Sequence, residues 1–172
     1  MELLERFASG DIEAFEALFR QFQREVYGWI IRIVRDPGAA EDLTVETFWR
    51  IYRAQARFDP ARSFGAWARR VATNVALEHL KTARHELAAT DDVAAQVSPD
   101  PAVRRDIRER VERAFRQLPA RLQAAAVLAL VEEKPYDQIA EALGISVGGV
   151  KSRVFRAVRL LRKKLKQLGV EP

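Results

Sequence analysis

Apolar residues recur along most of this chain at the three- and four-residue spacing of amphipathic helices. From about Leu3 to Arg84 the pattern predicts three or four helices. Turns divide them at Asp36-Pro37-Gly38 and at Phe58-Asp59-Pro60, because proline fixes its own φ and disfavours helix in the residue before it. We expect these helices to form a first packed unit.

A change in composition ends this first unit. Residues 86–102 hold few large apolar side chains and include four acids, one serine and two prolines, as is typical of a mobile linker. Beyond it, residues 103–118 and 122–130 predict two further helices separated at Pro119, and the rest of the chain predicts two more. The first of these four helices is expected to bury Val103, Ile107, Val111 and Phe115.

The pattern therefore predicts an all-α chain of two small helical domains, residues 1–85 and 103–172, joined by the flexible acidic linker 86–102. The composition agrees, since the 172 residues include only 8 glycines and 7 prolines. A chain of this length can bury a core but does not accommodate a large catalytic barrel.

Residues 136–158, YDQIAEALGISVGGVKSRVFRAV, carry the most specific pattern. An apolar stripe that reaches Leu143 stops at Gly144, as at a helix C-terminal cap, and Ser146 can cap a second helix by accepting a backbone N–H. The face of this second helix that we expect to be buried is made of Val147, Val150, Val154, Ala157, Val158 and Leu161. Helix, glycine-containing turn and helix together predict a helix-turn-helix.

The second helix carries polar and basic residues away from its apolar face. The residues placed to meet DNA are Gly148, Gly149, Lys151, Ser152, Arg153, Phe155, Arg156 and Arg159. A recognition helix reads base edges from its first turns, which favours Ser152 and Arg156, and the two glycines allow close approach to DNA. Lys151 and Arg153 suit phosphate contacts.

Charge agrees with this prediction without proving it. The net charge is +5, and from Lys151 to Lys166 there are eight basic residues and no acid before Glu171. A helix whose charged side chains are all positive suits a polyanionic partner. A solvated basic helix in an αα-hairpin is the alternative.

Residues 57–84 predict a helix with one apolar and one polar face. Ser63 can cap this helix, which is expected to bury Phe64, Ala68, Val71, Ala72 and Val75. The opposite surface carries Arg70, Asn74 and Lys81, with Trp67 at its edge. Cations follow phosphates, a flat ring stacks on bases and an amide pairs with a base edge, as single-stranded DNA requires. A core position for Trp67 and a merely exposed Asn74 are the alternatives.

Residues 38–54 predict another amphipathic helix. Its apolar side is formed by Leu43, Phe48, Ile51 and Tyr52. Its other side carries Glu41, Asp42, Glu46, Arg50 and Arg53. The pattern alone favours a solvated helix face.

Residues that carry enzymatic chemistry are sparse. The chain has no cysteine, its two histidines, His79 and His85, stand alone, and no nucleophile arrangement or paired-carboxylate motif stands out. We therefore expect no enzyme, no cofactor and no metal. The charged N-terminal segment and the lack of an apolar run of membrane-spanning length predict a cytoplasmic protein without membrane insertion.

These motifs resemble those of the sigma-70 family of transcription initiation factors. The string YDQIAEALGISVGGVKSRVFRAVRLLRKKL resembles region four, especially that of the extracytoplasmic function (ECF) group, and residues 38–84 resemble region two. The resemblance implies that the helix-turn-helix binds the minus-thirty-five promoter element, with Lys151, Ser152, Phe155 and Arg156 as contacts. Gly149 departs from the pattern, because relatives commonly have threonine there.

The resemblance also implies roles for the first domain. Minus-ten recognition and melting, with a flipped base beside the loop 58–63, would involve Phe58, Ser63, Trp67, Arg70, Asn74 and Lys81. The β′ coiled coil of core RNA polymerase would contact Asp42, Glu46, Arg50 and Arg53. Val45 stands where relatives commonly have glutamine.

Further partners follow from the same resemblance. It implies contact of the second domain with the polymerase β flap and control by an anti-sigma factor. The acidic linker, with Glu86, Asp91, Asp92 and Asp100, would approach the RNA path. The alternatives are an autonomous helix-turn-helix regulator that does not join polymerase, and a basic helical scaffold that uses residues 151–166 on membranes or RNA.

Overall fold

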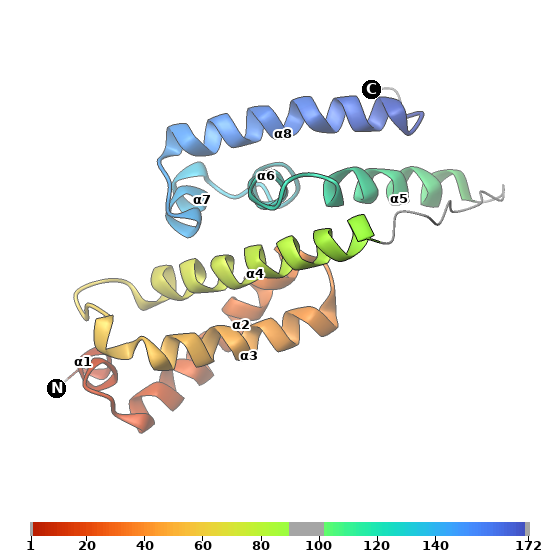
Figure 1. The fold of residues 1–172 in the computed structure, drawn as a ribbon. Coiled ribbons are helices and arrows are strands. Elements are labelled where there is room, and N and C mark those ends of the chain that lie inside the picture. The colour runs from red at the N-terminus through yellow and green to blue at the C-terminus, as the bar shows by residue number, and fades with distance from the viewer. Residues whose placement is uncertain (1, 90–101, 171–172) are drawn as a thin grey trace.

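A computed structural model describes residues 2–89 and 102–170 of the chain, and these form helices joined by short turns (Figure 1). The first half contains α1 (Leu3–Ala8), α2 (Ile12–Val34), α3 (Pro37–Arg53), the 3-10 turn η1 (Gln55–Arg57) and α4 (Phe64–Ala89). The second half contains α5 (Ala102–Arg116), α6 (Ala120–Ala126), the π-helical segment η2 (Val127–Val131), α7 (Tyr136–Leu143) and α8 (Val147–Gln167). The predicted all-α class is confirmed.

Helix ends follow from local capping chemistry. The Asp11 carboxylate accepts backbone N–H groups at the start of α2, the nearer at 2.9 Å. Asp36 caps α3 by accepting the Ala39 N–H at 3.1 Å, with Pro37 in the first turn, where its missing N–H costs nothing. The predicted turn at residues 36–38 is therefore a helix start.

The first half packs α2, α3 and α4 around a shared apolar core. Trp29 is at its centre, and its buried indole N–H donates to Thr73 Oγ1 on α4 at 2.8 Å. Thr73 Oγ1 in turn donates to the Arg69 carbonyl at 2.7 Å, so the only polar atom of the indole is satisfied. This pair fixes the register of α2 against α4.

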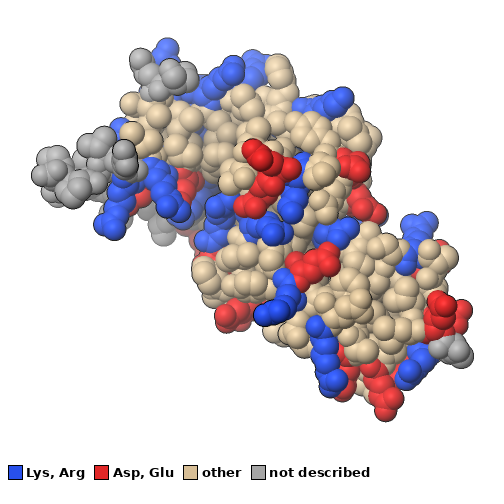
Figure 2. Space-filling view, turned by 180° about the vertical axis from the view of Figure 1, so that it is seen from behind, with Lys and Arg blue, Asp and Glu red and all other residues tan. Residues whose placement is uncertain are grey.

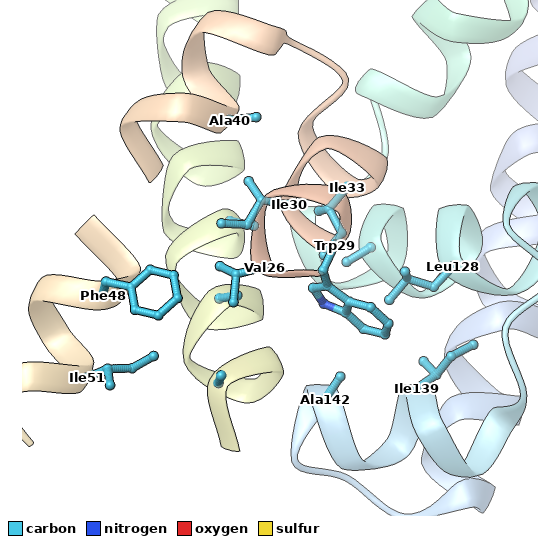
Figure 3. Packing of buried hydrophobic residues seen from close by; sticks show 14 of the residues in the cluster. Val26, Trp29, Ile30, Ile33, Ala40, Phe48, Ile51, Leu128, Ile139 and Ala142 are labelled. Carbon is cyan, nitrogen blue, oxygen red and sulfur yellow. The ribbon is translucent and has the colours of Figure 1, made fainter. Parts of the chain in front are cut away.

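The hydrophobic core continues from the first half into the second. Figure 1 shows α4 between α2 and α3 on one side and α6 and α7 on the other. In Figure 3 the Trp29 ring points toward Leu128 of η2 and Ile139 of α7, and all three are buried. A smaller cluster joins α5, α6 and α8 through Ala114, Leu118, Ala126, Ala157 and Leu161. The two predicted helical units are therefore packed against each other, which the sequence pattern did not indicate.

Polar contacts cross the same junction. Glu132, directly after η2, accepts a hydrogen bond from Arg35 at 3.0 Å and lies 3.4 Å from Arg32, both from the end of α2. Arg69 of α4 pairs with Glu25 of α2 and lies 4.0 Å from Glu141 of α7. The two halves thus meet through apolar packing bordered by ion pairs.

Several expected boundaries need correction. Helix α4 continues to Ala89, so Glu86 is helical, while Asp91, Asp92 and Asp100 lie outside the described residues. Ile107 is 45% exposed and Val147 is 40% exposed, contrary to their expected burial. Ile107 lies in the half of α5 away from the Ala114–Leu118 cluster, and Val147 is the first residue of α8, beside the turn.

Candidate nucleic-acid interface

The turn between α7 and α8 has the predicted geometry. Gly144 ends α7 with φ +66°, a left-handed conformation that favours glycine. Ser146 Oγ accepts the Gly149 N–H at 3.0 Å and so caps α8. Val150 and Val154 are buried on the inner face of α8. The sequence therefore predicted both helix ends of the helix-turn-helix.

The outer face of α8 is exposed over its first turns. Lys151, Ser152, Phe155, Arg156 and Arg159 all lie on it. The Arg156 guanidinium donates to Ser152 Oγ at 3.3 Å, and the Arg159 guanidinium lies 6.0 Å from the centre of the Phe155 ring. Phe155 is 64% exposed, which is unusual for a large apolar side chain among cations. Such a side chain suits apolar contact with a base, for example a thymine methyl group.

Arg153 lies differently from its neighbours on α8, because it is partly buried. Burial lowers its pKa, and the nearby cations Arg121 and Arg156 lower it further. Arginine stays charged under such a shift, because a free guanidinium remains protonated far above neutral pH. A phosphate contact at Arg153 would relieve the repulsion.

The two glycines of α8 are not required by packing. A Cβ at Gly148 would meet its nearest neighbour, Ser146 Oγ, at 3.8 Å. A Cβ at Gly149 would lie 3.4 Å from Ile145 and Ser146, an ordinary contact distance. Neither glycine has a left-handed backbone. The fold alone therefore gives no reason for glycine at either position.

The polar face of α4 is also accessible. Ser63 Oγ accepts the Ala66 N–H at 3.3 Å and caps the helix as predicted. Arg70, Asn74 and Lys81 are exposed along α4. The face offers two cations and an unobstructed amide, the groups expected of a single-strand contact.

The aromatic residues beside this face pack together. Trp67 is partly buried, with its ring centre 4.9 Å from Phe58, 5.9 Å from Phe64 and 6.2 Å from Phe7. Phe58 is 6% exposed, so its ring supports the loop and offers no surface to a base in this arrangement. The Phe58 ring also lies 5.7 Å from the ring of Phe7, so a direct contact of Phe58 with a base would require it to leave this packing. Trp67 keeps an accessible edge.

Arg70 connects the two candidate DNA surfaces. A Cβ at Gly144 would lie 3.0 Å from Arg70 Nη2, so the guanidinium rests against the turn of the helix-turn-helix. Glycine is thus favoured at position 144 both by its φ and by the close approach of Arg70. The minus-ten candidate surface and the turn before α8 are neighbours in this arrangement.

On α3, the side chains expected to meet a partner divide into two groups. Arg50 donates to Glu46 at 2.7 Å and to both carboxylate oxygens of Glu78 on α4 at 2.9 and 2.7 Å. The Arg50 guanidinium lowers the pKa of Glu78, and these two carboxylates raise the pKa of Arg50. Asp42 and Arg53 are exposed. Glu46 and Arg50 therefore hold α3 on α4, whereas Asp42 and Arg53 are available.

Helix α3 also carries an exposed apolar patch that was not predicted from the sequence. Val45 is 68% exposed and Trp49 is 54% exposed, at positions that follow Asp42 by three and seven residues. Trp49 stacks on Tyr52 with ring centres 6.1 Å apart. Exposed apolar side chains grouped among polar ones mark interaction surfaces. The signal was present, since Trp49 lies outside the predicted apolar side of this helix.

The surface charge is mixed on the face seen in Figure 2, where acidic and basic side chains are interspersed. The concentration of cations is local, along the exposed side of α8. No helix within the part of the chain that the structure describes is long and apolar enough to cross a membrane.

Comparison with known proteins identifies the family. The family model "Sigma-70 region 2" matches residues 18–86, and "Sigma-70, region 4" matches residues 108–161. RNA polymerase sigma-H factor of Pseudomonas aeruginosa is 35% identical over 97% of this chain and 94% of its own length. ECF RNA polymerase sigma factor BldN of Streptomyces coelicolor is 33% identical over 96% of this chain and 65% of its own.

Solved structures agree on the fold. The sigma factor RpoE of Bartonella quintana, solved with the anti-sigma factor NepR, superimposes with a TM-score of 0.56 at 22% identity, covering 90% of this chain and 98% of that one. The chain belongs to the sigma-70 family of RNA polymerase sigma factors, in its ECF group. It is a transcription initiation factor of the kind that binds core RNA polymerase and directs it to promoters.

Proposed function

We propose that the two candidate DNA surfaces divide promoter recognition between them, with the face of α8 docking on the minus-thirty-five element and the face of α4 opening and holding the minus-ten element. The observation that carries this proposal is the exposed row Ser152, Phe155 and Arg156 directly after a capped helix-turn-helix turn. Both surfaces occur on one chain in the order of the two family regions.

At the minus-thirty-five element, Ser152 and Arg156 read base edges and Phe155 makes an apolar base contact. Lys151, Arg153 and Arg159 neutralise phosphates, and Gly148 and Gly149 let the helix start approach the backbone closely. The exposure of all these residues except the partly buried Gly149 and Arg153 supports this assignment.

At the minus-ten element, Asn74 pairs with an unstacked base while Arg70 and Lys81 follow the strand. The exposed edge of Trp67 lies beside a loop whose structural support is Phe58, with Ser63 fixing the helix start. Flipping a base costs a few kcal/mol, which these contacts must recover.

The polymerase contact is proposed for the exposed side of α3. Asp42 and Arg53 supply charge, and Val45 and Trp49 supply apolar area between them. Glu46 and Arg50 keep α3 fixed on α4 beneath this surface. An apolar Val45 in place of the usual glutamine fits a patch that already contains Trp49.

A regulatory partner and a cellular location follow from the relatives. RpoE of Bartonella quintana was solved with an anti-sigma factor. We expect a similar partner for this chain, and a cytoplasmic location, since its template is the chromosome. The β flap of the polymerase is the expected contact of the second half.

The test is transcription by core RNA polymerase, with and without this protein, on promoter fragments from its own genome. We expect promoter-dependent transcripts only when the protein is present. Arg156→Ala should weaken binding to the selected promoter by about 1–3 kcal/mol, and Lys166→Ala, in the last turn of the same helix, is the matched control. Asn74→Ala should reduce strand opening, measured by permanganate reactivity, more than duplex binding.

Three results would contradict the proposal. Absence of any promoter-dependent transcript would exclude the initiation role. Specific duplex binding without polymerase recruitment would favour the autonomous regulator. Equal losses for Arg156→Ala at promoter and unrelated DNA would mean that Arg156 contacts phosphate alone.

A further inference from the structure

A basic cavity lies between the two halves of the molecule, away from the turn of the helix-turn-helix. It has a volume of about 540 Å³ and is lined by Lys81, Arg84 and His85 of α4, and by Pro119, Ala120 and Arg121 at the start of α6. Figure 1 shows α6 lying beside α4. None of the six lining residues is acidic.

The cations of this cavity lack local partners. Lys81, Arg84 and Arg121 are exposed, and none of them forms an ion pair with a residue that the structure describes. Lys81 is close enough to Glu78 to help lower the pKa of that carboxyl, but Glu78 is already held by Arg50. Arg121 repels a second cation, since it contributes to the lowered pKa of Arg153 on α8.

Packing of α6 against α4 therefore brings like charges together. Such a contact is unfavourable by itself and becomes favourable when an anion occupies the space between the charges. The cavity volume is within the range of about 300–1,000 Å³ typical of small-molecule sites. Arginine guanidinium groups bind phosphate oxygens in bidentate geometry, and two of them line the cavity, Arg84 from α4 and Arg121 from α6.

We propose that this cavity binds a small free anion of the phosphate class, with the pyrophosphate group of a nucleotide as the chemistry that fits, and that the bound anion stabilises the packed arrangement of the two halves. Lys81, Arg84 and Arg121 hold the phosphate oxygens. Because the site draws residues from both α4 and α6, separation of the two halves divides it. Anion binding and separation of the halves are therefore antagonistic. Lys81 also belongs to the proposed minus-ten face, so a bound anion and a DNA strand compete for this side chain.

The direct test is calorimetric titration of the full chain with pyrophosphate, at an ionic strength held constant with sodium chloride. We expect saturable binding with one site per chain and a higher melting temperature in pyrophosphate than in chloride. Arg84→Ser and Arg121→Ser should each weaken binding at least tenfold. Arg20→Ser, with a side chain 77% exposed on α2, removes the same charge elsewhere and should leave binding unchanged.

Other outcomes would overturn the proposal. If Arg20→Ser weakens binding as much as the cavity variants, the effect is one of net charge. If only Arg84→Ser weakens it, the anion is held by α4 alone and no site spans the halves.

A further titration uses a short single-stranded oligonucleotide in place of pyrophosphate. Binding of the oligonucleotide but not of pyrophosphate would assign these cations to nucleic-acid backbone contact. Circular dichroism confirms that each variant is folded.

Discussion

Thr73 illustrates how one hydroxyl can decide the packing of two helices. Its Oγ1 accepts the indole N–H of Trp29 at 2.8 Å and donates to the Arg69 carbonyl, and both side chains are buried. The sequence placed Thr73 on a helix but gave no sign that it partners a residue 44 positions away. A buried donor without a partner is costly, which makes this contact important for the first half of the molecule.

We predict that Thr73→Val lowers the free energy of unfolding by about 1–3 kcal/mol, because valine fills the same space and leaves the Trp29 N–H without an acceptor. Urea denaturation of both proteins measures this. The double variant Thr73→Val with Trp29→Phe is the control. Its loss should be smaller than the sum of the two single losses, and strict additivity would show that the hydrogen bond has no role in stability.

Arg50 gives a prediction about pH. Its contact lowers the pKa of Glu78 in the folded state, so the stabilisation is fully present above the ordinary carboxylate pKa and is lost as pH falls through the lowered one. The groups are partly exposed, so Arg50→Ala should cost only about 1 kcal/mol at pH 7. The difference in unfolding free energy between the two proteins should shrink in acid. A difference that is constant with pH would rule out the Glu78 contribution.

At the scale of the helix, the capping of α8 and its two early glycines have opposite effects. Ser146 stabilises the start of the helix, whereas Gly148 and Gly149 weaken it without a packing reason. This combination is expected where a helix end must both form and come close to a ligand.

We predict that Gly149→Ala raises the free energy of unfolding by up to about 1 kcal/mol, because alanine has the higher helix propensity and its Cβ has room. The same change should weaken promoter binding by bringing Cβ toward the DNA backbone. Thermal denaturation and promoter titration measure the two effects. Gly28→Ala, in the middle of α2 with no atom within 4 Å of the added Cβ, controls for helix propensity alone. Unchanged promoter affinity in Gly149→Ala would refute the close approach.

Local patterns accounted for the helix elements better than for their contacts. The caps at Ser63 and Ser146 and the stop at Gly144 were predictable, because each depends on residues within a few positions. The buried ring of Phe58 and the ion pairs of Arg50 were not, because they depend on partners from other helices. The exposed Trp49 had a visible signal in the helical wheel, since it lay among charged residues.

At the scale of the whole molecule, the packed arrangement conflicts with simultaneous contact at both promoter elements. Elements about 25 base pairs apart, as their names specify, are on the order of 85 Å apart at 3.4 Å per base pair. Helix α4, with 26 residues, is only about 39 Å long, and α8 lies in the layer beyond α6 and α7 (Figure 1). Simultaneous binding of the two proposed DNA surfaces therefore requires the two halves to separate, which would expose the apolar surface around Trp29 and Ile139.

Separation can be observed directly, since the chain has no cysteine and accepts two introduced labelling sites. We predict that a donor–acceptor pair at Arg20→Cys and Lys163→Cys, on α2 and α8, gives a single energy-transfer efficiency in the free protein, set by the packed arrangement. Transfer should fall when core RNA polymerase and promoter DNA are added. Unchanged transfer in a transcriptionally active complex would contradict the need for separation.

The ion pairs of Glu132 with Arg32 and Arg35 should bias this equilibrium toward the packed state, because they join η2 to the end of α2 and Glu132 is partly shielded from water. Glu132→Gln removes the charge at nearly constant volume. With about 1 kcal/mol lost, the ratio of packed to separated molecules should fall about fivefold. The neighbouring Glu133 is exposed and forms no ion pair with a residue that the structure describes, so Glu133→Gln is the matched control. Energy transfer in the labelled protein should fall for Glu132→Gln alone.

An equal change in both variants would attribute the preference for the packed state to net charge. No change in either variant would leave apolar packing as the sole source of this preference.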